Sequence, residues 1–532
     1  MWKGGIYMHS KISRCSILVL LSVILTALLS FASYSMPTDA VSERVELRTE
    51  TSKHWQNSDG TLTAEIFSGP VHYRDIDGAW KEIDTRLEPS EKAGFAHSAT
   101  KNRFKSHLAA DAKGRHAVEL EGIEFAFTAD VLEAALGTVE DSSITYANAW
   151  PDADLKYTVL PMGIKEDIIL KSRPSVSQFR FIVKSGGLEP VTADRGINFV
   201  DKDGKVVVFI PGPFMIDANG AYSDAVEATW RSLSDGTVEL LLEPDQEWLS
   251  KAVYPVVIDP TFYAATGTGA ASMDATLTRL QQLYPPPTPP STSYSWNYSS
   301  SYLTIGRYTS SPNTWTLYGC IKWDISSVPQ NAVVEDTSCI ELNKYTSGST
   351  NKNLRLNKIT QAWPPSARPT SVSVLEQYFN GYVGTPDIFP CEAEDKAAFC
   401  QMVQGWIWDQ STNHGVEFEP VTGGDYNIQV WASEGSSYYR PKLVIDYSLD
   451  TTPPNPGTAT SPAYANTSPI VINYSGASDE TGGSGLKTVE LWFKKGMSGA
   501  WTNSGQSLTT ASGSFNFTGM TGDDTYYLDL RA

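Results

Sequence analysis

The chain has 532 residues, and its 41 lysines and arginines against 60 aspartates and glutamates give a formal net charge of −19 at pH 7. Such an acidic surface repels the phosphates of nucleic acids and of anionic lipids, so the composition disfavours nucleic-acid binding. Because domains typically have about 100–200 residues, the length predicts about three domains.

The amino terminus has the pattern of a secretory signal. Lys3, Lys11 and Arg14 precede an apolar run over residues 16–32 that ends in small residues. A basic segment, an apolar core and small residues are the three parts of a signal peptide, so we predict that residues 1–35 direct export and are removed. An uncleaved anchor is the alternative, because the run approaches the roughly 20 residues that span a bilayer. No membrane span is expected after cleavage.

Residues 41–262 contain repeated turn signals between short β-prone runs. Asp59-Gly60 and Asp203-Gly204 are examples, and each lies between apolar or β-branched stretches. An Asx-Gly pair supplies the positive φ angles that a tight two-residue hairpin needs. We therefore predict a hairpin-rich amino-terminal β domain over residues 41–262.

Three stretches of this region, at residues 48–85, 144–170 and 252–261, carry a family resemblance. They resemble the amino-terminal β-region of large secreted wall-associated proteins, which often continue into RHS/YD repeats. The most specific stretch is YPVVIDPT, which closes the region. The resemblance implies a structural, surface-exposed module without known catalytic residues. No YD repeats follow in this sequence, which departs from the toxin-carrying pattern.

Residues 270–449 contain strand-like runs separated by Pro, Gly, Asn and Ser, which is typical of a β-sandwich. The motifs that carry a resemblance here are Asp274-Ala275, Lys322-Trp323-Asp324, Val403-Gln404-Gly405-Trp406 and Arg440-Pro441. Their order resembles the DNRLRE-type domain, which is similar to carbohydrate-binding modules with a jelly-roll fold. The resemblance implies a jelly-roll β-sandwich whose partner is a polysaccharide or cell-wall glycan. Ser299, where a glycine is usual, and the proline-rich loop at 285–290 depart from the pattern.

Four aromatic residues are the candidate glycan-binding residues of this segment. They are Tyr294, Trp296, Tyr298 and Trp315. They gather in a loop-rich stretch, and pyranose rings stack on aromatic faces. The alternative is that these rings pack under a long loop, because amphipathic aromatic side chains are often part-buried. Trp323, Trp363 and Trp406 lie on strand-like or amphipathic runs and are predicted to be core residues.

Three acidic residues are candidate ligands of a structural calcium ion. Asp274, Asp324 and Glu434 lie in the resemblance motifs or beside them, and calcium prefers oxygen ligands of this kind. The alternative is that these carboxylates are solvated or cap turns.

Four cysteines lie in the same segment: Cys320, Cys339, Cys391 and Cys400. An even number of cysteines within one domain of an exported protein predicts two disulfides, for which three connectivities are possible. A zinc site is the rival interpretation, but no CxxC pair or nearby histidine supports it.

Residues 450–532 begin with a Pro/Thr-rich linker and continue as short alternating runs. The runs predict an Ig-like β-sandwich, and the lead-in DTTPP resembles that of bacterial Ig-like or fibronectin-III-like modules. The sequence stops at Ala532, directly after a strand-like run, so we expect a truncated Ig-like domain and a fragment of a longer protein.

The sequence lacks the local motifs of common enzymes. GxSxG, HExxH and GxxxxGK[ST] are all absent. Carboxylate pairs of the glycosidase kind arise by chance in so acidic a chain. The sequence therefore predicts that the chain is not an enzyme, unless it is a non-catalytic part of a larger modular enzyme.

Two functional hypotheses follow from these observations. The first is a secreted or cell-surface protein that binds polysaccharide or cell-wall glycan through the jelly-roll domain. The second is a structural presentation region of a larger surface protein or toxin carrier, whose active part lies beyond Ala532. The fold class predicted in both cases is all-β and multidomain.

Overall fold

The structure is a computed structural model. It describes residues 40–193, 196–219, 221–264, 274–282, 291–297, 302–310, 313–345, 351–362, 368–380, 385–390, 392–421, 423–433 and 439–532. The predicted signal at residues 1–35 lies outside this range. No helix within the described part of the chain is long and apolar enough to cross a membrane.

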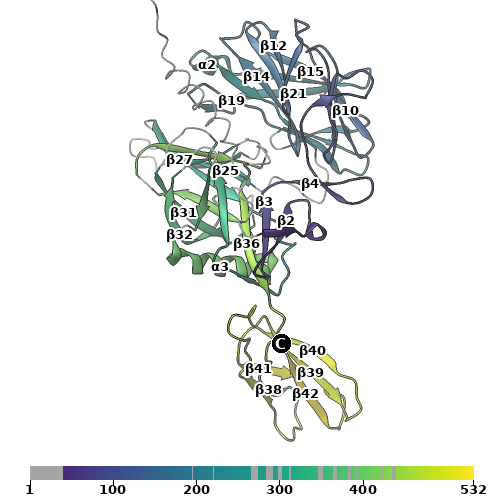
Figure 1. The fold of residues 1–532 in the computed structure, drawn as a ribbon, viewed down its shortest axis with the longest axis vertical. Coiled ribbons are helices and arrows are strands. Elements are labelled where there is room, and N and C mark those ends of the chain that lie inside the picture. The colour runs from purple at the N-terminus through teal and green to yellow at the C-terminus, as the bar shows by residue number, and fades with distance from the viewer. Residues whose placement is uncertain are drawn as a thin grey trace, which may run out of the picture.

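The predicted all-β, multidomain fold class is confirmed. The chain forms three bodies, which follow one another along the long axis of the molecule (Figure 1). We call them the amino-terminal body (residues 71–264), the middle body (residues 40–67 with 274–449) and the carboxy-terminal body (residues 450–532). The strand pairs within them are antiparallel, as is usual for hairpin-rich sheets.

The amino-terminal body consists of two sheets that enclose a large apolar core. Its eight-stranded sheet contains β6 (Glu88–Pro89), β7 (His97–Ala99), β8 (Lys105–Leu108), β9 (His116–Leu120), β10 (Ile123–Ala129), β15 (Phe179–Lys184), β21 (Val226–Ser232) and β22 (Val238–Pro244). Its eleven-stranded sheet contains β11 (Gly137–Glu140), β12 (Ser143–Trp150), β13 (Ala153–Val159), β14 (Gly163–Leu170), β16 (Glu189–Ala193), β17 (Gly196–Val200), β18 (Val206–Pro211), β19 (Phe214–Ile216), β20 (Tyr222–Ser223), β23 (Val256–Asp259) and β24 (Phe262–Ala264). A short helix, α2 (Gln246–Leu249), and the hairpin of β4 (His72–Arg74) and β5 (Trp80–Glu82) complete it.

The described glycines of the Asx-Gly turns have the predicted positive φ angles, but the aspartates before them do not, and the loops are longer than the predicted two-residue hairpins. Gly204 and Gly236 have φ angles of +79° and +81°, in the left-handed region that favours glycine. Rings from both sheets, such as Phe125, Tyr157 and Phe199, meet in the core. The hairpins therefore form where expected from local sequence, and the core joins them into one body.

The middle body is a sandwich of a seven-stranded and an eight-stranded sheet. The seven-stranded sheet contains β1 (Ala40–Glu43), β2 (Ser52–Asn57), β3 (Leu62–Phe67), β29 (Ala332–Val334), β30 (Cys339–Asn343), β33 (Pro386–Phe389) and β36 (Lys442–Leu449). The eight-stranded sheet contains β25 (Asp274–Gln282), β26 (Ser291–Asn297), β27 (Tyr302–Ser310), β28 (Asn313–Ile321), β31 (Lys352–Ile359), β32 (Ser371–Phe379), β34 (Val416–Pro420) and β35 (Tyr426–Trp431). Buried residues of both sheets form one core.

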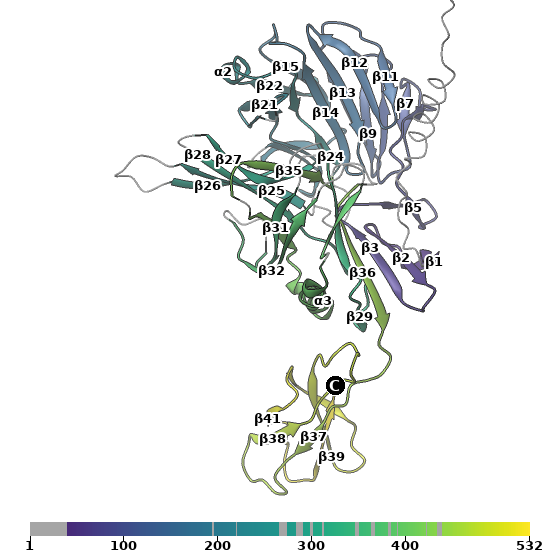
Figure 2. The same ribbon diagram turned by 60° about the vertical axis from the view of Figure 1, so that its left-hand side comes forward.

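The first strands of the chain belong to this middle body, which differs from the predicted domain over 41–262. Strand β3 pairs with β36 from Leu62 opposite Tyr447 to Phe67 opposite Lys442 (Figure 2). Every residue of β3 is buried, because the strand lies between β2 and β36 rather than at an edge. The amino-terminal body is thus inserted between β3 and β25 of the middle body.

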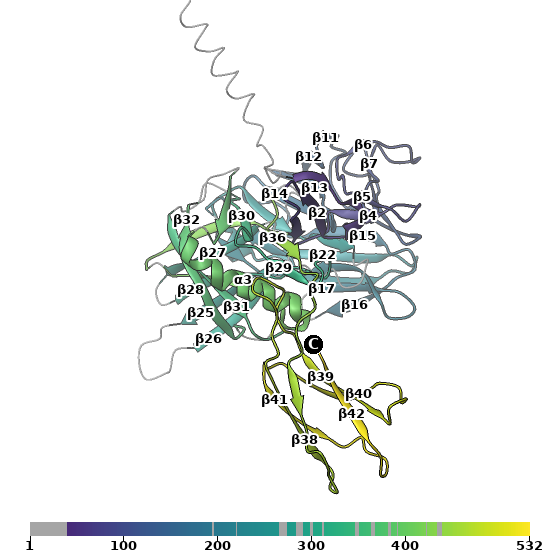
Figure 3. The ribbon, with the colours of Figure 1, turned by 60° about the horizontal axis from the view of Figure 1, so that its bottom comes forward.

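One long helix, α3 (Ala393–Trp408), lies along the middle body between β29 and β32 (Figure 3). Its buried residues are Phe399, Met402, Val403, Trp406 and Ile407. This i, i+3, i+4, i+7, i+8 spacing is that of one apolar helix face. Trp406 and the strand-flanking Trp323 are fully buried, as predicted, whereas Trp363 lies outside the described residues.

The expected pair of disulfides is not supported by the structure. Cys320, Cys339 and Cys400 are free thiols, and Cys391 lies outside the described residues. Cys320 lies on β28 in a small apolar cluster, while Cys400 on α3 donates its thiol hydrogen to the Glu335 carbonyl at 3.4 Å. An even count of cysteines indicates that pairing is possible, but strand register and helix placement decide which thiols meet.

The carboxy-terminal body has two three-stranded sheets around a small core. They contain β37 (Thr458–Thr460), β38 (Ile470–Ser475) and β41 (Gly513–Phe517) in one sheet, and β39 (Val489–Lys495), β40 (Thr502–Leu508) and β42 (Tyr526–Arg531) in the other. The Trp408 indole at the end of α3 donates to the Ser484 carbonyl at 2.7 Å. This bond joins the carboxy-terminal body to the middle body.

Candidate functional site

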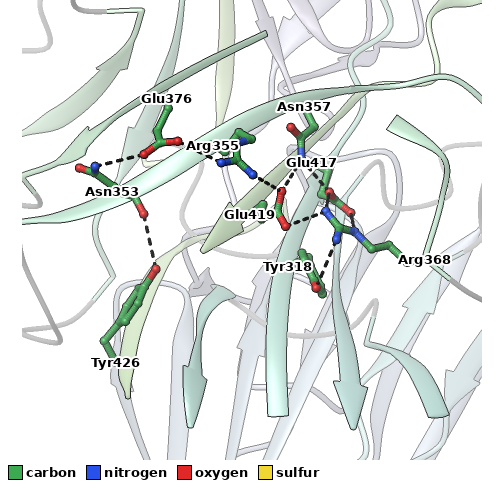
Figure 4. A network of polar contacts seen from close by, with 9 residues as sticks. All are labelled: Tyr318, Asn353, Arg355, Asn357, Arg368, Glu376, Glu417, Glu419 and Tyr426. Atoms are coloured by element: carbon green, nitrogen blue, oxygen red, sulfur yellow. Dashed lines mark hydrogen bonds and ion pairs between the residues drawn. The ribbon is translucent and has the colours of Figure 1, made fainter. Parts of the chain in front are cut away.

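Strand register gathers charged and amide side chains on one face of the eight-stranded sheet. Directly paired residues of antiparallel strands have their side chains on the same face. The pairs are Asn357 with Glu417, Arg355 with Glu419, Arg355 with Glu376, and Asn353 with Tyr378. Figure 4 shows most of these side chains and their contacts. We call this set, together with Arg368, the polar face.

One end of the polar face is buried and is organised by a single carboxylate. Glu417 is completely buried, and it accepts two hydrogen bonds from Arg368, at 2.5 and 2.9 Å. Asn357 donates to both Glu417 and Glu419 at 3.0 Å. The Arg368 guanidinium lies 4.2 Å from the centroid of the Tyr318 ring (Figure 4). A bidentate arginine–carboxylate pair fixes both groups in one geometry.

Neighbouring groups shift the pKa values of the charged side chains at this end of the polar face. Burial lowers the pKa of Arg368, but its hydrogen bonds and charge interaction with Glu417 outweigh that effect and raise it. Burial raises the pKa of Glu419, but the hydrogen bonds from Asn357 and Arg368 outweigh it, so this pKa is lowered. Arg368 and Glu419 therefore stay charged, as a buried ionic network requires.

The other end of the polar face is open to solvent. The side chains of Arg355 and Glu376 are 36% and 37% exposed and form an ion pair at 3.1 Å. Asn353 donates to Glu376 at 3.2 Å, and the opposite residue, Tyr378, is 60% exposed. An accessible aromatic ring beside several hydrogen-bond donors and acceptors is suited to a sugar, which has an apolar C–H face and a rim of hydroxyls.

The four predicted aromatic residues do not form one site in the described part of the chain. Tyr294 is opposite Arg279 and Trp315 is opposite Leu280, so the two rings lie on opposite faces of the sheet. Tyr294 packs against the small apolar cluster that contains Cys320. The side chain of Trp296, and Tyr298 as a whole, lie outside the described residues.

Trp315 has a partner that the sequence analysis did not identify. Its ring is stacked on that of Tyr308, with centroids 4.5 Å apart and an angle of 8° between the planes. The two residues are directly paired across β27 and β28, and Tyr308 is 44% exposed. Trp315 is half-buried in this cross-strand pair, and Tyr308 is the more exposed of the two rings.

The three predicted calcium ligands have different environments. Asp274 is 1% exposed, and its carboxylate accepts hydrogen bonds from the Ser433 amide at 2.7 Å and hydroxyl at 2.9 Å. Asp324 is exposed and accepts from the Ser326 amide at 2.9 Å, so it caps a turn. Glu434 lies outside the described residues.

Another acidic group has the spacing of metal ligands. Asp450, Asp479 and Glu480 each place a carboxylate oxygen within 4.8 Å of the others. They lie where the middle body joins the carboxy-terminal body. Among the described residues these are the side chains that could hold a divalent cation, and none of them belongs to the predicted set.

The sequence analysis missed Tyr308, Tyr378 and the arginines of the polar face. For Glu376 and Tyr378 the sequence contains a signal, because residues two positions apart on a strand have their side chains on the same face. For Arg368 and Glu417 there is no local signal, since 49 positions separate them. Their meeting depends on the sheet order and on a loop.

The comparisons with known proteins find wall-associated relatives. Over 54% of its length, the chain is 28% identical to the tRNA3(Ser)-specific nuclease WapA of Bacillus spizizenii and 27% identical to the tRNA nuclease WapA of Bacillus subtilis. Over 33% of its length, it is 25% identical to a wall-associated protein of Geobacillus stearothermophilus, of which 75% is covered. The match spans only 13% of the length of each of the two nucleases.

No family model matches the chain. No solved structure matches it either.

These relatives confirm the predicted location, which is the cell surface or the extracellular space. They also correct one prediction. The prediction that the chain is not an enzyme is wrong, because more than half of the chain is similar to proteins named as tRNA nucleases. That prediction depended on missing local motifs, and catalytic groups brought together from distant segments leave no such motif.

Proposed function

We propose that this cell-surface protein binds wall polysaccharide on the polar face of its middle body. The observation that carries the proposal is Tyr378, which is 60% exposed and directly opposite Asn353. In our proposal a pyranose ring stacks on Tyr378, while its hydroxyls bond to Asn353, Glu376 and Arg355. The resemblance of residues 270–449 to carbohydrate-binding modules supports the same ligand class.

The polar face is already ordered without a ligand, which favours binding. Arg355 is held by Glu376 at 3.1 Å and by Glu419 at 3.3 Å. Glu419 is in turn held by the buried end of the network through Arg368. A ligand then binds without first ordering these side chains, and that ordering would otherwise cost about 0.5–1.5 kcal/mol for each flexible side chain.

A sedimentation assay with insoluble cell-wall material tests the proposal. We expect the secreted chain to sediment with wall polysaccharide and the Tyr378→Ala variant to bind about tenfold more weakly, because it loses the stacking surface. Tyr464→Ala is the matched control, since Tyr464 is 96% exposed and lies on the carboxy-terminal body. Failure of the secreted chain to bind any wall polysaccharide, or equal binding by Tyr378→Ala, would contradict the proposal.

The names of three relatives support a second candidate, in which the protein cleaves tRNA. Wall binding would then display a nuclease activity at the cell surface. Incubation of the secreted chain with total tRNA and Mg²⁺, followed by gel analysis, tests whether these 532 residues carry it. Cleavage of tRNA that boiled protein does not produce supports this candidate, and intact tRNA at high protein concentration counts against it for this chain.

A further inference from the structure

The outer face of one sheet in the carboxy-terminal body carries aromatic rings and cations that the proposed function does not use. On β39, Val489 and Leu491 are fully buried, so the alternate residues Glu490, Trp492 and Lys494 point away from the core. The residues directly paired with these three include Arg531, Asp529 and Tyr527 on β42, and Asn503 on β40. We call these seven residues, together with Trp501, the ladder face.

Each cation of the ladder face lies over an aromatic ring. The Arg531 guanidinium carbon is 3.8 Å from the centroid of the Trp492 ring. The Lys494 ammonium is 5.1 Å from the centroids of both Trp501 and Tyr527. Contact with an aromatic face holds a cation in place without neutralising it. The charges of Arg531 and Lys494 are therefore positioned and still available.

Neither cation has an acidic partner among the described residues. Lys494 donates to the Met497 carbonyl at 3.0 Å, and Arg531 is exposed. The nearest acid by register, Glu490, accepts hydrogen bonds from the Trp492 indole and from Asn503, both at 2.9 Å. In a chain where 60 acidic residues face 41 lysines and arginines, two unpaired cations on one face are unexpected.

We propose that the ladder face binds a carboxylate-bearing polysaccharide. A guanidinium carries five N–H donors in a planar fork, and they match a carboxylate bidentately. Arg531 is opposite Glu490, four residues before Lys494, so the two backbone positions are about 13 Å apart along the strands. The Arg531 guanidinium lies over Trp492, two residues nearer to Lys494, so the two cations follow one strand direction, and successive uronate units of a polymer present a carboxylate to each.

The local charge balance selects this class of ligand. Glu490 and Asp529 lie on the same face. Their negative charges repel a doubly charged phosphate monoester more strongly than a singly charged carboxylate. The remaining acidic residues of the chain act weakly at this distance, because the Debye length is about 8 Å at physiological ionic strength. The exposed rims of Trp501 and Tyr527 then contact the sugar rings between carboxylates.

Titration of the secreted chain with polygalacturonate at about 0.15 M salt tests this inference. We expect binding that Arg531→Gln and Lys494→Gln each weaken about tenfold, as the loss of a charge-assisted hydrogen bond does. The matched control is Arg173→Gln, which removes an exposed arginine of the amino-terminal body. Dextran, a neutral polysaccharide, should not bind at this face.

Several outcomes would overturn the inference. They are absence of polygalacturonate binding, equal binding by Arg531→Gln, and equal loss on Arg173→Gln. Equal or tighter binding of a polyphosphate would also contradict the choice of carboxylate. Tyr378→Ala should leave polygalacturonate binding unchanged, so the test distinguishes this face from the polar face. A thermal melt of each variant checks that the fold is retained.

Discussion

The carboxylate of Glu65 and the ammonium of Lys442 form a buried ion pair at 2.7 Å between residues 377 positions apart in the chain. Glu65 is on β3 and Lys442 begins β36, so the pair joins the first hairpin to the last strand of the middle body. Lys442 also contacts Glu341 at 3.0 Å. The middle body is therefore closed by the amino-terminal segment of the chain.

Deletion of residues 40–67 should destabilise the middle body. The deletion exposes one edge of β36 and removes Leu62, Ala64 and Ile66 from the core. An exposed apolar strand edge promotes aggregation, so we expect a lower thermal midpoint and association during size-exclusion chromatography. A deletion of residues 450–532 is the control, because it leaves the β3–β36 pairing intact. Equal midpoints for the chain with and without residues 40–67 would show that β3 contributes little.

Lys442→Met should destabilise the fold more than the small change in side-chain volume suggests. The substitution keeps the apolar part of the side chain but leaves Glu65 and Glu341 buried without a cation. Removal of one partner from a buried ion pair typically costs about 3–5 kcal/mol. Urea unfolding measures this change, and the double variant Glu65→Gln with Lys442→Met should recover part of the loss. A change below about 1 kcal/mol, in the range of exposed pairs, would contradict the buried pairing.

Acid should weaken the same junction through His54. Burial lowers the pKa of His54 from 6.5 to about 4, and its Nδ1 contacts the Tyr447 hydroxyl at 3.2 Å. Because the folded pKa is below the unfolded one, the unfolded chain binds the proton first. The contribution to stability is therefore complete above pH 6.5 and is lost as the pH falls from 6.5 to about 4.

The size of this pH effect can be measured by urea unfolding at pH 7 and pH 4.5. We expect His54 to account for about 2 kcal/mol of the stability lost, because one unit of pKa difference corresponds to about 1.4 kcal/mol and pH 4.5 is still above the folded pKa of about 4. His54→Phe should reduce the pH dependence by that amount. His72 also contributes to the loss of folding stability in acid, because burial lowers its pKa to about 4 as well. An unchanged pH dependence in His54→Phe would show that His54 is not the group responsible.

The free thiols predict a specific labelling pattern. Cys320 is completely buried, and burial raises the pKa of its thiol, so iodoacetamide should not modify it in the native protein. After denaturation without a reductant, Cys320, Cys339 and Cys400 should all be alkylated. Mass spectrometry of the peptides gives the result directly. A disulfide-linked peptide that contains two of these three residues would contradict the structure.

Local features of the fold could be predicted from the sequence, and distant pairings could not. Asx-Gly pairs such as Asp59-Gly60 predict hairpins because the turn depends on adjacent residues. The pairing of β3 with β36 has no such signal, because the sequence of a buried strand such as β3 does not specify which strand lies beside it. Helix α3 was missed although its buried residues have helical spacing, because the segment lies among strand-like runs.

The candidate site shows the same limit. Trp315 was chosen because it is aromatic and lies in a loop-rich stretch, yet it is the less exposed ring of a pair with Tyr308. Tyr378 lies on an ordinary alternating strand, and its exposure is decided by the position of β32 at the edge of the sheet. Residue type led to the prediction of a glycan ligand, whereas strand order determined how far each ring is exposed.

Hydroxyl-radical footprinting with and without wall polysaccharide tests the central claim most directly. Tyr378 and Tyr464 are both highly exposed, so both should be oxidised in the free protein. Our account predicts that bound polysaccharide protects Tyr378 and leaves Tyr464 unchanged. If polysaccharide binds and the oxidation of Tyr378 does not fall, the polar face is not the binding site.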